Sequence, residues 1–451
     1  MSEQRNWISD RLASFGDGIA LIADGQRSSF DAIRQAMASW QAFLAQRDIA
    51  RCTVIVNGDY SCAMVGVILA LYTRHCVVVP LNRSSPERCA AVARTTAASW
   101  IFDADAPHQL QAADTGLAPH ELVAGLFERR EAGLILLSSG SSGEPKAILL
   151  SLEKLFTKYR DAPRSRPRVT AAFLLLDHIG GFNTLLHCLF SGSTLVKLDA
   201  RDAVSICRQI AEHRIQLLPA TPTFLNMLLW GRVYDTYDLS SLELVTYGTE
   251  TMPESTLTAL NEVFPSVRFK QTYGMSELGI LSTRSESNDS LWIQIATDDV
   301  QVKVVDQILW IKTRTAMLGY LNAPSVIDQE GWLCTGDLVE TRGDYFRILG
   351  RGESLINVGG LKVLPVEVES HLLSLPFVKD AVVWGRKSSV TGQIVAATVV
   401  LEDEQDAEDA KRRIVLHCQQ ALEDFKVPRH IEFVTGRLHS DRFKKIKVAS
   451  Q

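Results

Sequence analysis

Short apolar runs rich in β-branched residues alternate with longer helical patterns through the first part of the chain. Between residues 30 and 80 these runs include Thr53–Val56 and Val77–Val79. The apolar stretch Ala63–Tyr72 is much shorter than the ~20 residues that span a bilayer, so it predicts a buried helix. The alternation predicts α/β units around a mostly parallel sheet.

The same rhythm returns between residues 171 and 265. Strands are predicted at Ala171–Leu176, Thr194–Leu198, Ile215–Leu218 and Leu242–Tyr247, and helices at Ala203–His213 and Glu254–Val263. The chain therefore contains a second α/β unit.

Past Trp292 the pattern changes to short alternating runs, which predict a small antiparallel or β-barrel-like subdomain. These runs are Val300–Val305, Ile308–Lys312 and Tyr345–Leu349. A compact α+β tail follows, so the predicted fold is α/β with a large N-terminal domain, residues 1–351, and a small C-terminal domain, residues 352–451. Polar loops are predicted at Arg160–Arg168, Ser282–Ser290 and Glu402–Asp409.

Bulk properties narrow the class of protein. A chain of 451 residues exceeds what one hydrophobic core supports, so two or more domains are expected. A net charge of −5 provides no basic field for nucleic acid. The eight cysteines are scattered without a C-x-x-C pair, which argues against a zinc site or disulfides and for a reducing compartment. The N-terminus has no secretory pattern, and we expect a cytoplasmic protein without a membrane span.

The strongest local signal is the segment from Ser138 to Lys146, which follows the apolar run Leu134–Leu137. Small residues after a strand let backbone N–H groups approach an anion, and the hydroxyls add donors. The segment lacks the G-x-x-x-x-G-K-[ST] spacing of the nucleoside triphosphatase P-loop. Taken alone, a Ser/Gly-rich segment is more often a plain flexible loop, but the preceding strand and the following Pro145-Lys146 favour an anion site.

With this segment, the chain resembles the AMP-forming acyl and aryl ligases, which include acyl-CoA synthetases, luciferases and the adenylation domains of peptide synthetases. Four further segments match that family's motifs in order and spacing: Val77–Asn82, Gln271–Glu277, Cys334–Leu338, and Leu349–Arg351 with its continuation Ile356–Glu369. The resemblance covers nearly the whole chain.

The resemblance implies a nucleotide site. Tyr273 would stack on adenine, Glu277 would hold Mg²⁺, Asp337 would accept from the ribose hydroxyls, and Arg351 would donate to ribose and phosphate. The plainer interpretations are a core tyrosine, a solvated glutamate, a turn aspartate and a surface ion pair. The other implied nucleotide-binding residues are Ser138, Ser139, Gly140, Ser141, Ser142, Gly143, Lys146, Gly248, Thr249, Glu250, Gly274 and Ser276.

The family's catalytic lysine belongs near the C-terminal end of the chain. Ungapped counting from Phe433-Val434 places it at Lys444, with Phe443 where the family usually has glycine. Lys445 is the alternative. A cationic tail on a solvated strand is the plainer interpretation of both residues.

The acyl pocket is less marked in the sequence. The resemblance implies a pocket formed by His178, Phe182 and Gly279, although His178 is equally typical of a packed structural histidine. Asp177 is the nearest acidic residue that could pair with an α-ammonium group. Glu353 occupies the family's hinge position, and the resemblance implies that the small C-terminal domain is mobile. The pair Gly359–Gly360 suits the approach of a thiol, and equally suits a conformational turn.

These observations predict an ATP- and Mg²⁺-dependent ligase that activates a small carboxylic acid as acyl-AMP and transfers the acyl group to CoA. The alternative acceptor is the phosphopantetheine of an acyl carrier protein. A luciferase-like oxidation shares the same motifs. A non-catalytic binding protein of this fold would be expected to have lost Glu277, Asp337 and Arg351, and all three are present.

Overall fold

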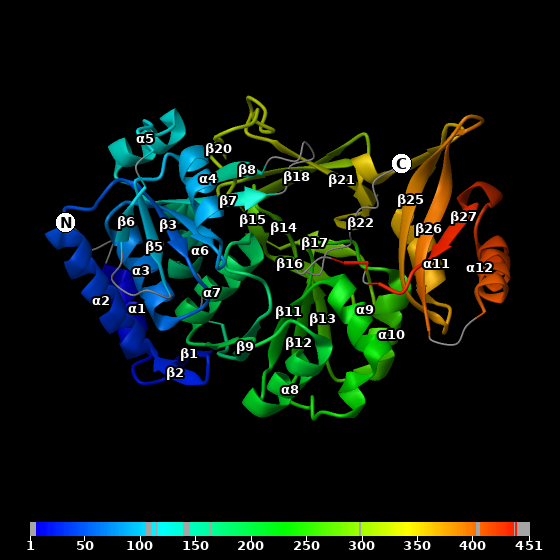
Figure 1. Cartoon of the computed structure of the whole chain (residues 1–451), viewed down its shortest axis with the longest axis horizontal. Helices are drawn as coiled ribbons and strands as arrows, with labels where there is room; N and C mark the ends of the chain where they lie inside the picture. Colours follow the sequence, from blue (N-terminus) through cyan, green and yellow to red (C-terminus); the bar gives the residue numbers. More distant parts are fainter. Residues whose placement is uncertain are drawn as a thin grey trace.

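The computed structural model describes residues 6–104, 110–113, 115–138, 145–161, 165–296, 299–402, 406–436 and 438–439. Figure 1 shows two α/β regions at the left and centre and a separate C-terminal α+β region at the right. Among the described helices, none is both long and apolar enough to cross a membrane. All eight cysteines are free thiols, as predicted.

The first large sheet has the order β20-β8-β7-β4-β3-β5-β6. Its centre is parallel, and every residue of β3 and β4 is buried, as expected for strands covered by helices on both faces. The strands are β3 (Thr53–Asn57), β4 (Val77–Leu81), β5 (Trp100–Asp103), β6 (Leu110–Ala112), β7 (Gly133–Ser138), β8 (Lys146–Ser151) and β20 (Gly319–Tyr320). Its helices are α2 (Phe30–Gln46), α3 (Cys62–Thr73), α4 (Pro86–Thr96), α5 (Glu121–Arg129) and α6 (Leu152–Arg160). The apolar stretch predicted as a buried helix is α3.

The second large sheet has the order β13-β12-β11-β9-β10-β1-β2 and is parallel except for β2. Its strands are β1 (Ile19–Ala23), β2 (Gln26–Ser29), β9 (Val169–Ala172), β10 (Thr194–Lys197), β11 (Leu217–Ala220), β12 (Leu244–Tyr247) and β13 (Arg268–Gln271). The helices are α1 (Asn6–Ala13), α7 (Ile179–Ser191), α8 (Ala203–His213), α9 (Pro222–Gly231) and α10 (Glu254–Val263), with a 3₁₀ turn η2 (Val233–Asp235). Helices α8 and α10 have the predicted bounds.

Two predicted strands of the second sheet are shifted at both ends in the structure, and two others, Thr194–Leu198 and Leu242–Tyr247, are shorter at one end, as β10 and β12. The apolar run Ala171–Leu176 continues past the end of β9 because Phe173 and Leu176 are buried in a loop, where the His178 N–H donates to the Leu175 carbonyl. Strand β11 begins at Leu217 rather than Ile215, because the Ile215 N–H still donates to the end of α8 at Ile210. Apolar runs therefore mark burial more reliably than strand ends.

The predicted antiparallel subdomain is a six-stranded sheet of order β16-β17-β22-β21-β19-β18. Its strands are β16 (Thr283–Ser285), β17 (Ile293–Ile295), β18 (Val300–Val305), β19 (Ile308–Thr313), β21 (Leu333–Arg342) and β22 (Tyr345–Arg351). A two-stranded ribbon, β14 (Tyr273–Met275) and β15 (Gly279–Leu281), leads into it. The predicted loop Ser282–Ser290 is wrong in part, because β16 lies within it and pairs with β17.

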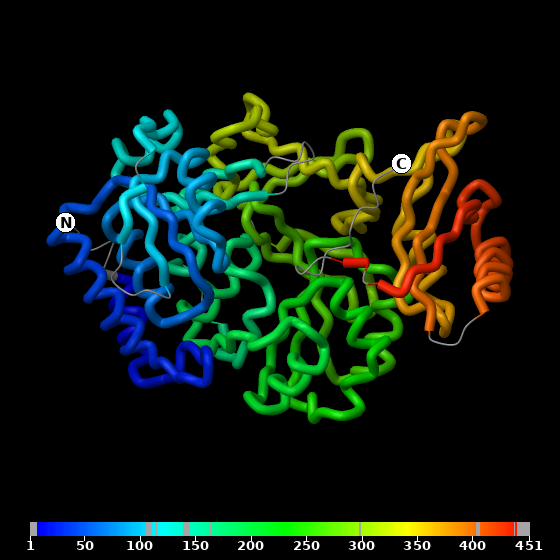
Figure 2. The backbone as a smooth tube through the Cα atoms, in the orientation of Figure 1, coloured from blue at the N-terminus to red at the C-terminus, as the bar shows by residue number. Residues whose placement is uncertain are grey.

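The C-terminal region has its own core and sheet, of order β24-β23-β26-β25 with β27 paired to β26. It contains η3 (Gly352–Ser354), β23 (Ile356–Val358), β24 (Leu361–Val363), α11 (Pro365–Leu373), β25 (Val378–Ser388), β26 (Gly392–Leu401), α12 (Ala407–Ala421), η4 (Asp424–Lys426) and β27 (His430–Phe433). The predicted loop Glu402–Asp409 is shortened by the start of α12, where the Asp406 side chain caps the helix. Figure 2 shows the chain entering this region once, after β22. A domain boundary between residues 351 and 352 stays a prediction.

Candidate active site

A cavity of about 810 Å³ lies where the carboxyl ends of β11, β12 and β13 meet the ribbon β14–β15 and strand β21. This is the edge at which open parallel sheets bind ligands. Segments far apart in the sequence meet here. The predicted site residues that line it are Ser138, Lys146, His178, Gly248, Thr249, Gly274, Ser276, Glu277, Arg351 and Glu353. We call it the active-site cavity.

The hairpin β21–β22 brings two predicted motifs together. Its antiparallel register pairs Asp337 with Arg351, and the Arg351 Nε lies 2.7 Å from the Asp337 Oδ1. The Arg351 Nη1 also donates to the Thr335 carbonyl at 2.8 Å. Burial raises the pKa of the Asp337 carboxyl, while the Arg351 guanidinium opposes that shift. The hairpin thus holds a buried carboxylate and a guanidinium at the cavity wall.

Tyr273 contacts the same carboxylate from β14. Its hydroxyl donates to the Asp337 Oδ2 at 2.7 Å, and its ring packs edge-on against Phe346. Only 4% of the residue is exposed, and it belongs to the core of the antiparallel sheet. Burial raises the pKa of the Tyr273 hydroxyl, and the Asp337 carboxylate raises it further. The structure shows Tyr273 positioning Asp337, and its stacking on adenine stays a prediction.

Glu277 lies in the turn between β14 and β15 and is largely buried while lining the cavity. Its Oε1 accepts from the Tyr320 hydroxyl at 2.8 Å, and the Lys146 Nζ lies 5.1 Å from the centre of the Tyr320 ring. Among the described residues no three His, Cys, Asp or Glu side chains gather into a metal site. A magnesium ion held between one carboxylate and phosphate oxygens needs no such group, so Glu277 fits that ion.

Two contacts position the strand that follows the Ser/Gly-rich segment. The Asn322 Oδ1 accepts from the Ala147 N–H at 2.8 Å, and the Asn322 Nδ2 donates to the Pro145 carbonyl at 2.9 Å. Strand β20 pairs with β8, with Tyr320 opposite Ile148. Neither Tyr320 nor Asn322 was predicted from the sequence. The signal that could have found them is Gly319-Tyr320, a glycine–aromatic pair between strands β19 and β21 of the antiparallel sheet.

Helix α7 begins at the other end of the cavity. His178 caps it, and its Nδ1 accepts from the Gly180 N–H at 3.1 Å. Asn183 lines the cavity one turn later. Phe182, predicted as a pocket residue, is wholly buried in the core and does not line the active-site cavity. Both Phe182 and Gly279 instead line a small adjacent cavity of about 20 Å³.

The strand end after β12 is closely packed. A Cβ on Gly248 would lie 2.7 Å from the Thr272 Oγ1 and 2.8 Å from its carbonyl oxygen, so only glycine fits there. Thr249 adopts a φ of 71°, a conformation that β-branched residues rarely take and that often marks functional sites. Glu250 turns away from the active-site cavity. Its carboxylate accepts from the Thr223 hydroxyl at 2.7 Å.

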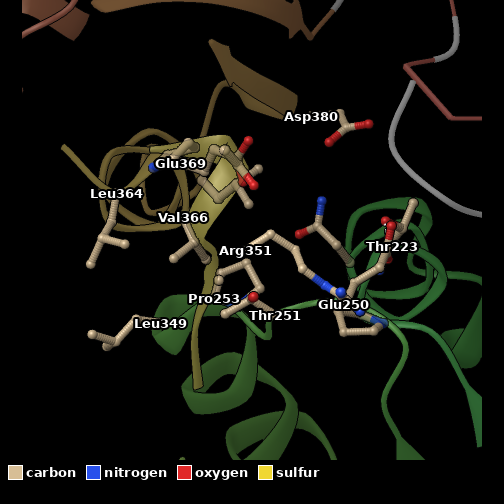
Figure 3. A pocket seen from close by; sticks show the side chains of 16 residues that line it. Thr223, Glu250, Thr251, Pro253, Leu349, Arg351, Leu364, Val366, Glu369 and Asp380 are labelled. Atoms are coloured by element: carbon tan, nitrogen blue, oxygen red, sulfur yellow. Dashed lines mark hydrogen bonds between the residues drawn. The ribbon is translucent and has the colours of Figure 1, made fainter. Parts of the chain in front are cut away.

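Glu250 lies at a second cavity of about 210 Å³ between the N-terminal and C-terminal parts of the chain. Figure 3 shows Glu250 and Arg351 on one side, with Glu369 and Asp380 on the other. Since Arg351 lines both cavities, it links the hairpin of the active-site cavity to the C-terminal part of the chain.

Direct hydrogen bonds also join these two parts. The Ser255 hydroxyl on α10 donates to the Ser370 carbonyl on α11 at 2.9 Å, and the Asn226 Nδ2 donates to the Lys379 carbonyl at 3.2 Å. These contacts fix one orientation of the C-terminal part. In it, Gly359 and Gly360 are exposed and line neither of these cavities.

Several predicted residues lie outside the described residues: Ser139, Gly140, Ser141, Ser142, Gly143, Lys444 and Lys445. Their roles stay predictions. Ser138 and Lys146, at the two ends of the Ser/Gly-rich segment, both line the active-site cavity.

Comparisons with known proteins found family matches in both the N-terminal and the C-terminal parts of the chain. Residues 8–321 match the family of AMP-binding enzymes, and residues 367–445 match the AMP-binding enzyme C-terminal domain. The chain is 28% identical over 345 residues to acyl-CoA synthetase 7 of Caenorhabditis elegans, covering 69% of this chain and 63% of that protein. It is 29% identical over 303 residues to 4-coumarate:CoA ligase 1 of Petunia hybrida, covering 60% of this chain and 56% of that protein. The matched regions span about three fifths of these relatives.

Solved structures share the fold over nearly the whole chain. The anthranilate CoA ligase AuaEII, in complex with anthranoyl-AMP, superposes with a TM-score of 0.81 at 20% identity, covering 97% of this chain and 95% of that one. The o-succinylbenzoate CoA synthetase of Bacillus subtilis, in complex with an acyl-adenylate, gives a TM-score of 0.75 at 20% identity, covering 99% and 97%. The predicted fold class is confirmed.

Proposed function

Because this chain belongs to the family of AMP-binding enzymes, we propose that it activates a carboxylic acid as acyl-AMP and transfers the acyl group to CoA. The observation that carries the proposal is the Asp337–Arg351 pair at the wall of a cavity that also collects Lys146 and Glu277. A carboxylate beside a guanidinium suits a ribose followed by a phosphate.

In the first half-reaction a carboxylate oxygen of the acid attacks the α-phosphorus of ATP, and pyrophosphate leaves. Each carboxylate oxygen of Asp337 has two lone pairs, one of them occupied by Arg351 or Tyr273, so each keeps an acceptor site for a ribose hydroxyl. The Tyr273 hydroxyl and the Arg351 guanidinium hold the carboxylate in place before ATP binds. This preorganisation lowers the cost of binding.

Two anions must approach each other in this step, so the site must supply positive charge. Magnesium held by Glu277 would neutralise the phosphates when bound. Lys146 lies beside Tyr320 at the same cavity. Lys444, or Lys445, would add a cation from the C-terminal part of the chain. Together these groups favour in-line attack by the carboxylate.

In the second half-reaction a thiol sulfur attacks the acyl carbonyl carbon, and AMP leaves with the bridging oxygen. We propose that the C-terminal domain turns about Glu353 to bring Gly359 and Gly360 toward the cavity. That movement breaks the Ser255–Ser370 and Asn226–Lys379 contacts. The CoA ligases among the curated relatives support CoA as the acceptor.

The test is a panel of carboxylic acids assayed for ATP-dependent pyrophosphate release, first without thiol, then with CoA, then with a phosphopantetheinylated carrier protein. We expect acid-dependent pyrophosphate and AMP, with acyl-CoA formed only when CoA is present. Transfer of the acyl group to the carrier protein but not to CoA would show that the acceptor is a carrier protein. Formation of ADP with every acid offered would overturn the proposal.

A further inference from the structure

We call the end of the active-site cavity that is lined by His178 and Asn183 its acyl end. A third cavity, of about 670 Å³, lies beyond it, and we call this one the outer cavity. Ile280 of β15 lines the active-site cavity, the small 20 Å³ cavity and the outer cavity alike. The side chain of Ile280 therefore lies between three neighbouring cavities. Ile280 lies three residues after Glu277, so this wall begins at the predicted reaction centre.

One face of α7 connects the same spaces. Asn183 lines the active-site cavity and the small cavity, while His187 and Ser191 line the outer cavity. Residues four apart lie on the same side of a helix, so these three form one polar stripe, about 12 Å long from the first to the last. The stripe runs from the acyl end of the active site into the outer cavity.

Lys158 of α6 stands at the junction. It lines both the small cavity and the outer cavity, and its Nζ donates to the Ile280 carbonyl at 2.8 Å. Among the described residues, no carboxylate lies within ion-pair distance of this ammonium group. An ammonium has three N–H donors, and the bond to the Ile280 carbonyl leaves two for a ligand.

Lys158 is exposed on the side of the outer cavity, so its ammonium group is open to a ligand there. Desolvation and the neighbouring Lys270 together lower the pKa of Lys158 to about 8, and Asp299 opposes the shift. Asp299 is itself paired with Arg314, at 2.8 Å. Burial also lowers the pKa of His187, which is therefore neutral at pH 7 and able to form hydrogen bonds. An anion at this position would favour the charged form of the lysine.

The small cavity has mostly apolar walls, into which Lys158, Tyr159 and Asn183 bring polar groups. The Tyr159 hydroxyl donates to the Asn183 Oδ1 at 2.7 Å, beside Lys158 in the small cavity. An alkyl chain here would take water from Lys158 and Asn183 without replacing its hydrogen bonds, which is unfavourable. A second carboxylate on the acid would instead accept from the ammonium.

We propose that the acid carries a second carboxylate at its far end, and that Lys158 binds that group at the junction beyond Ile280. Lys158 is then a specificity-determining residue that touches the substrate. This inference rests on the proposed acid-activating function. It requires the Ile280 side chain to move aside, since Ile280 now lies between the cavities.

The test compares straight-chain acids of increasing length, each as the monocarboxylic acid and as the α,ω-dicarboxylic acid, in ATP–pyrophosphate exchange. A charge-assisted hydrogen bond predicts that the wild type prefers the dicarboxylic acid of fitting length by about tenfold or more in kcat/KM. Lys158→Met keeps the length of the side chain and removes the charge, and it should abolish that preference. Lys154→Met, one turn earlier on α6, is the matched control and should retain it.

The outcomes separate the two proposals. If none of the acids supports ATP–pyrophosphate exchange, the proposed function is overturned. Exchange with monocarboxylic acids, without preference for any dicarboxylic acid, would overturn the role of Lys158 and leave the function standing. Lys158→Gln serves as a second variant, and circular dichroism with thermal melting checks that each variant is folded. A Lys158 variant that folds and keeps the dicarboxylate preference would equally overturn the inference.

Discussion

At the end of the active-site cavity that we propose binds the nucleotide, polar side chains are held by strands in register, whereas the proposed acyl end is formed by one face of α7 and by Ile280 of β15. Asp337 and Arg351 are register partners in β21–β22, and the Tyr273 hydroxyl fixes the same carboxylate. At the acyl end, Asn183 and Ile280 come from separate elements and share a wall with two further cavities.

The difference shows how the two ends can vary. A residue in a strand register has one neighbour across the hairpin, so changing it disturbs a fixed pair. A residue on a helix face has no fixed cross-strand partner, so it can be exchanged without disturbing such a pair. We therefore expect the nucleotide end to tolerate little change, and the acyl end to set which acid is used.

The largest effect is expected from the predicted catalytic lysine, Lys444, which lies outside the described residues. Lys444→Ala should lower adenylate formation by about a thousandfold, because it removes a cation from the attack of one anion on another. Thiol transfer from supplied acyl-AMP should be largely spared. Lys445→Ala is the matched control. Pyrophosphate exchange at the wild-type rate in Lys444→Ala would move the role to Lys445, and loss in neither variant would remove it from both.

The nucleotide end offers an internal comparison within one hairpin. Asp337–Arg351 and Glu340–Arg347 are both cross-strand acid–arginine pairs, but only Arg351 of the first pair lines the cavity, and neither member of the second does. Asp337→Asn should raise the KM for ATP by about a hundredfold, because two ribose hydroxyls lose a charged acceptor. Glu340→Gln should change it less than about twofold. Equal effects in the two variants would show that the hairpin acts only as a scaffold.

The start of α7 tests how rigid the acyl end is. A Cβ on Gly181 would lie 2.0 Å from the Leu175 carbonyl oxygen, so Gly181→Ala should destabilise the protein by about 3 kcal/mol. A Cβ on Gly180 would meet side-chain atoms alone, the end of Leu174 at 2.5 Å and the His178 Nδ1 at 3.3 Å, and side chains can move aside. Gly180→Ala is therefore the milder control. Urea unfolding of both variants measures the difference, and a Gly181→Ala variant as stable as Gly180→Ala would contradict this packing.

Glu277 lines the active-site cavity, and the effect of replacing it should depend on the magnesium concentration. Glu277→Gln keeps an acceptor for the Tyr320 hydroxyl and removes the charge, so activity should fall by about tenfold and recover in part at high Mg²⁺. Tyr320→Phe removes the hydrogen bond alone and should leave the magnesium dependence of the rate unchanged. A Glu277→Gln variant whose rate is indifferent to magnesium would remove Glu277 from the metal site.

The smallest effect concerns pH and the stability of the nucleotide end. Burial raises the pKa of Asp337 above its ordinary value of 3.8, so the folded state holds this proton more tightly than the unfolded state. The resulting stability is present below pH 3.8 and is lost as the pH rises through the raised pKa. Asp337→Asn does not titrate, so its stability relative to the wild type should increase from about pH 4 upward. Urea unfolding across this range would show no such trend if the arginine outweighed burial.

Much of the nucleotide end could be predicted from the sequence because its residues sit in short continuous motifs. The segments around Glu277, Asp337 and Arg351 each carry their own chemistry, and the fold brings them to one cavity. The orientation of Tyr273 could not be predicted, because it depends on packing against Phe346 from another strand.

The acyl end was harder to predict for a physical reason. Neighbouring positions on a helix point about 100° apart, so Phe182 and Asn183 face different sides, and the sequence alone does not say which one faces the ligand. Phe182 packs into the core, while Asn183 lines the cavity. Lys158 lies outside every motif in the sequence. The packing of α6 on α7 brings it to the junction of the small cavity and the outer cavity.

The central claim is that a carboxylate oxygen of the acid attacks the α-phosphorus of ATP. An acid labelled with ¹⁸O in its carboxylate, incubated with the enzyme, MgATP and CoA, tests this directly by mass spectrometry of the AMP. The account predicts AMP carrying one ¹⁸O atom, since the bridging oxygen leaves with AMP when the thiol attacks. Unlabelled AMP, or label in inorganic phosphate with ADP as the other product, would contradict it.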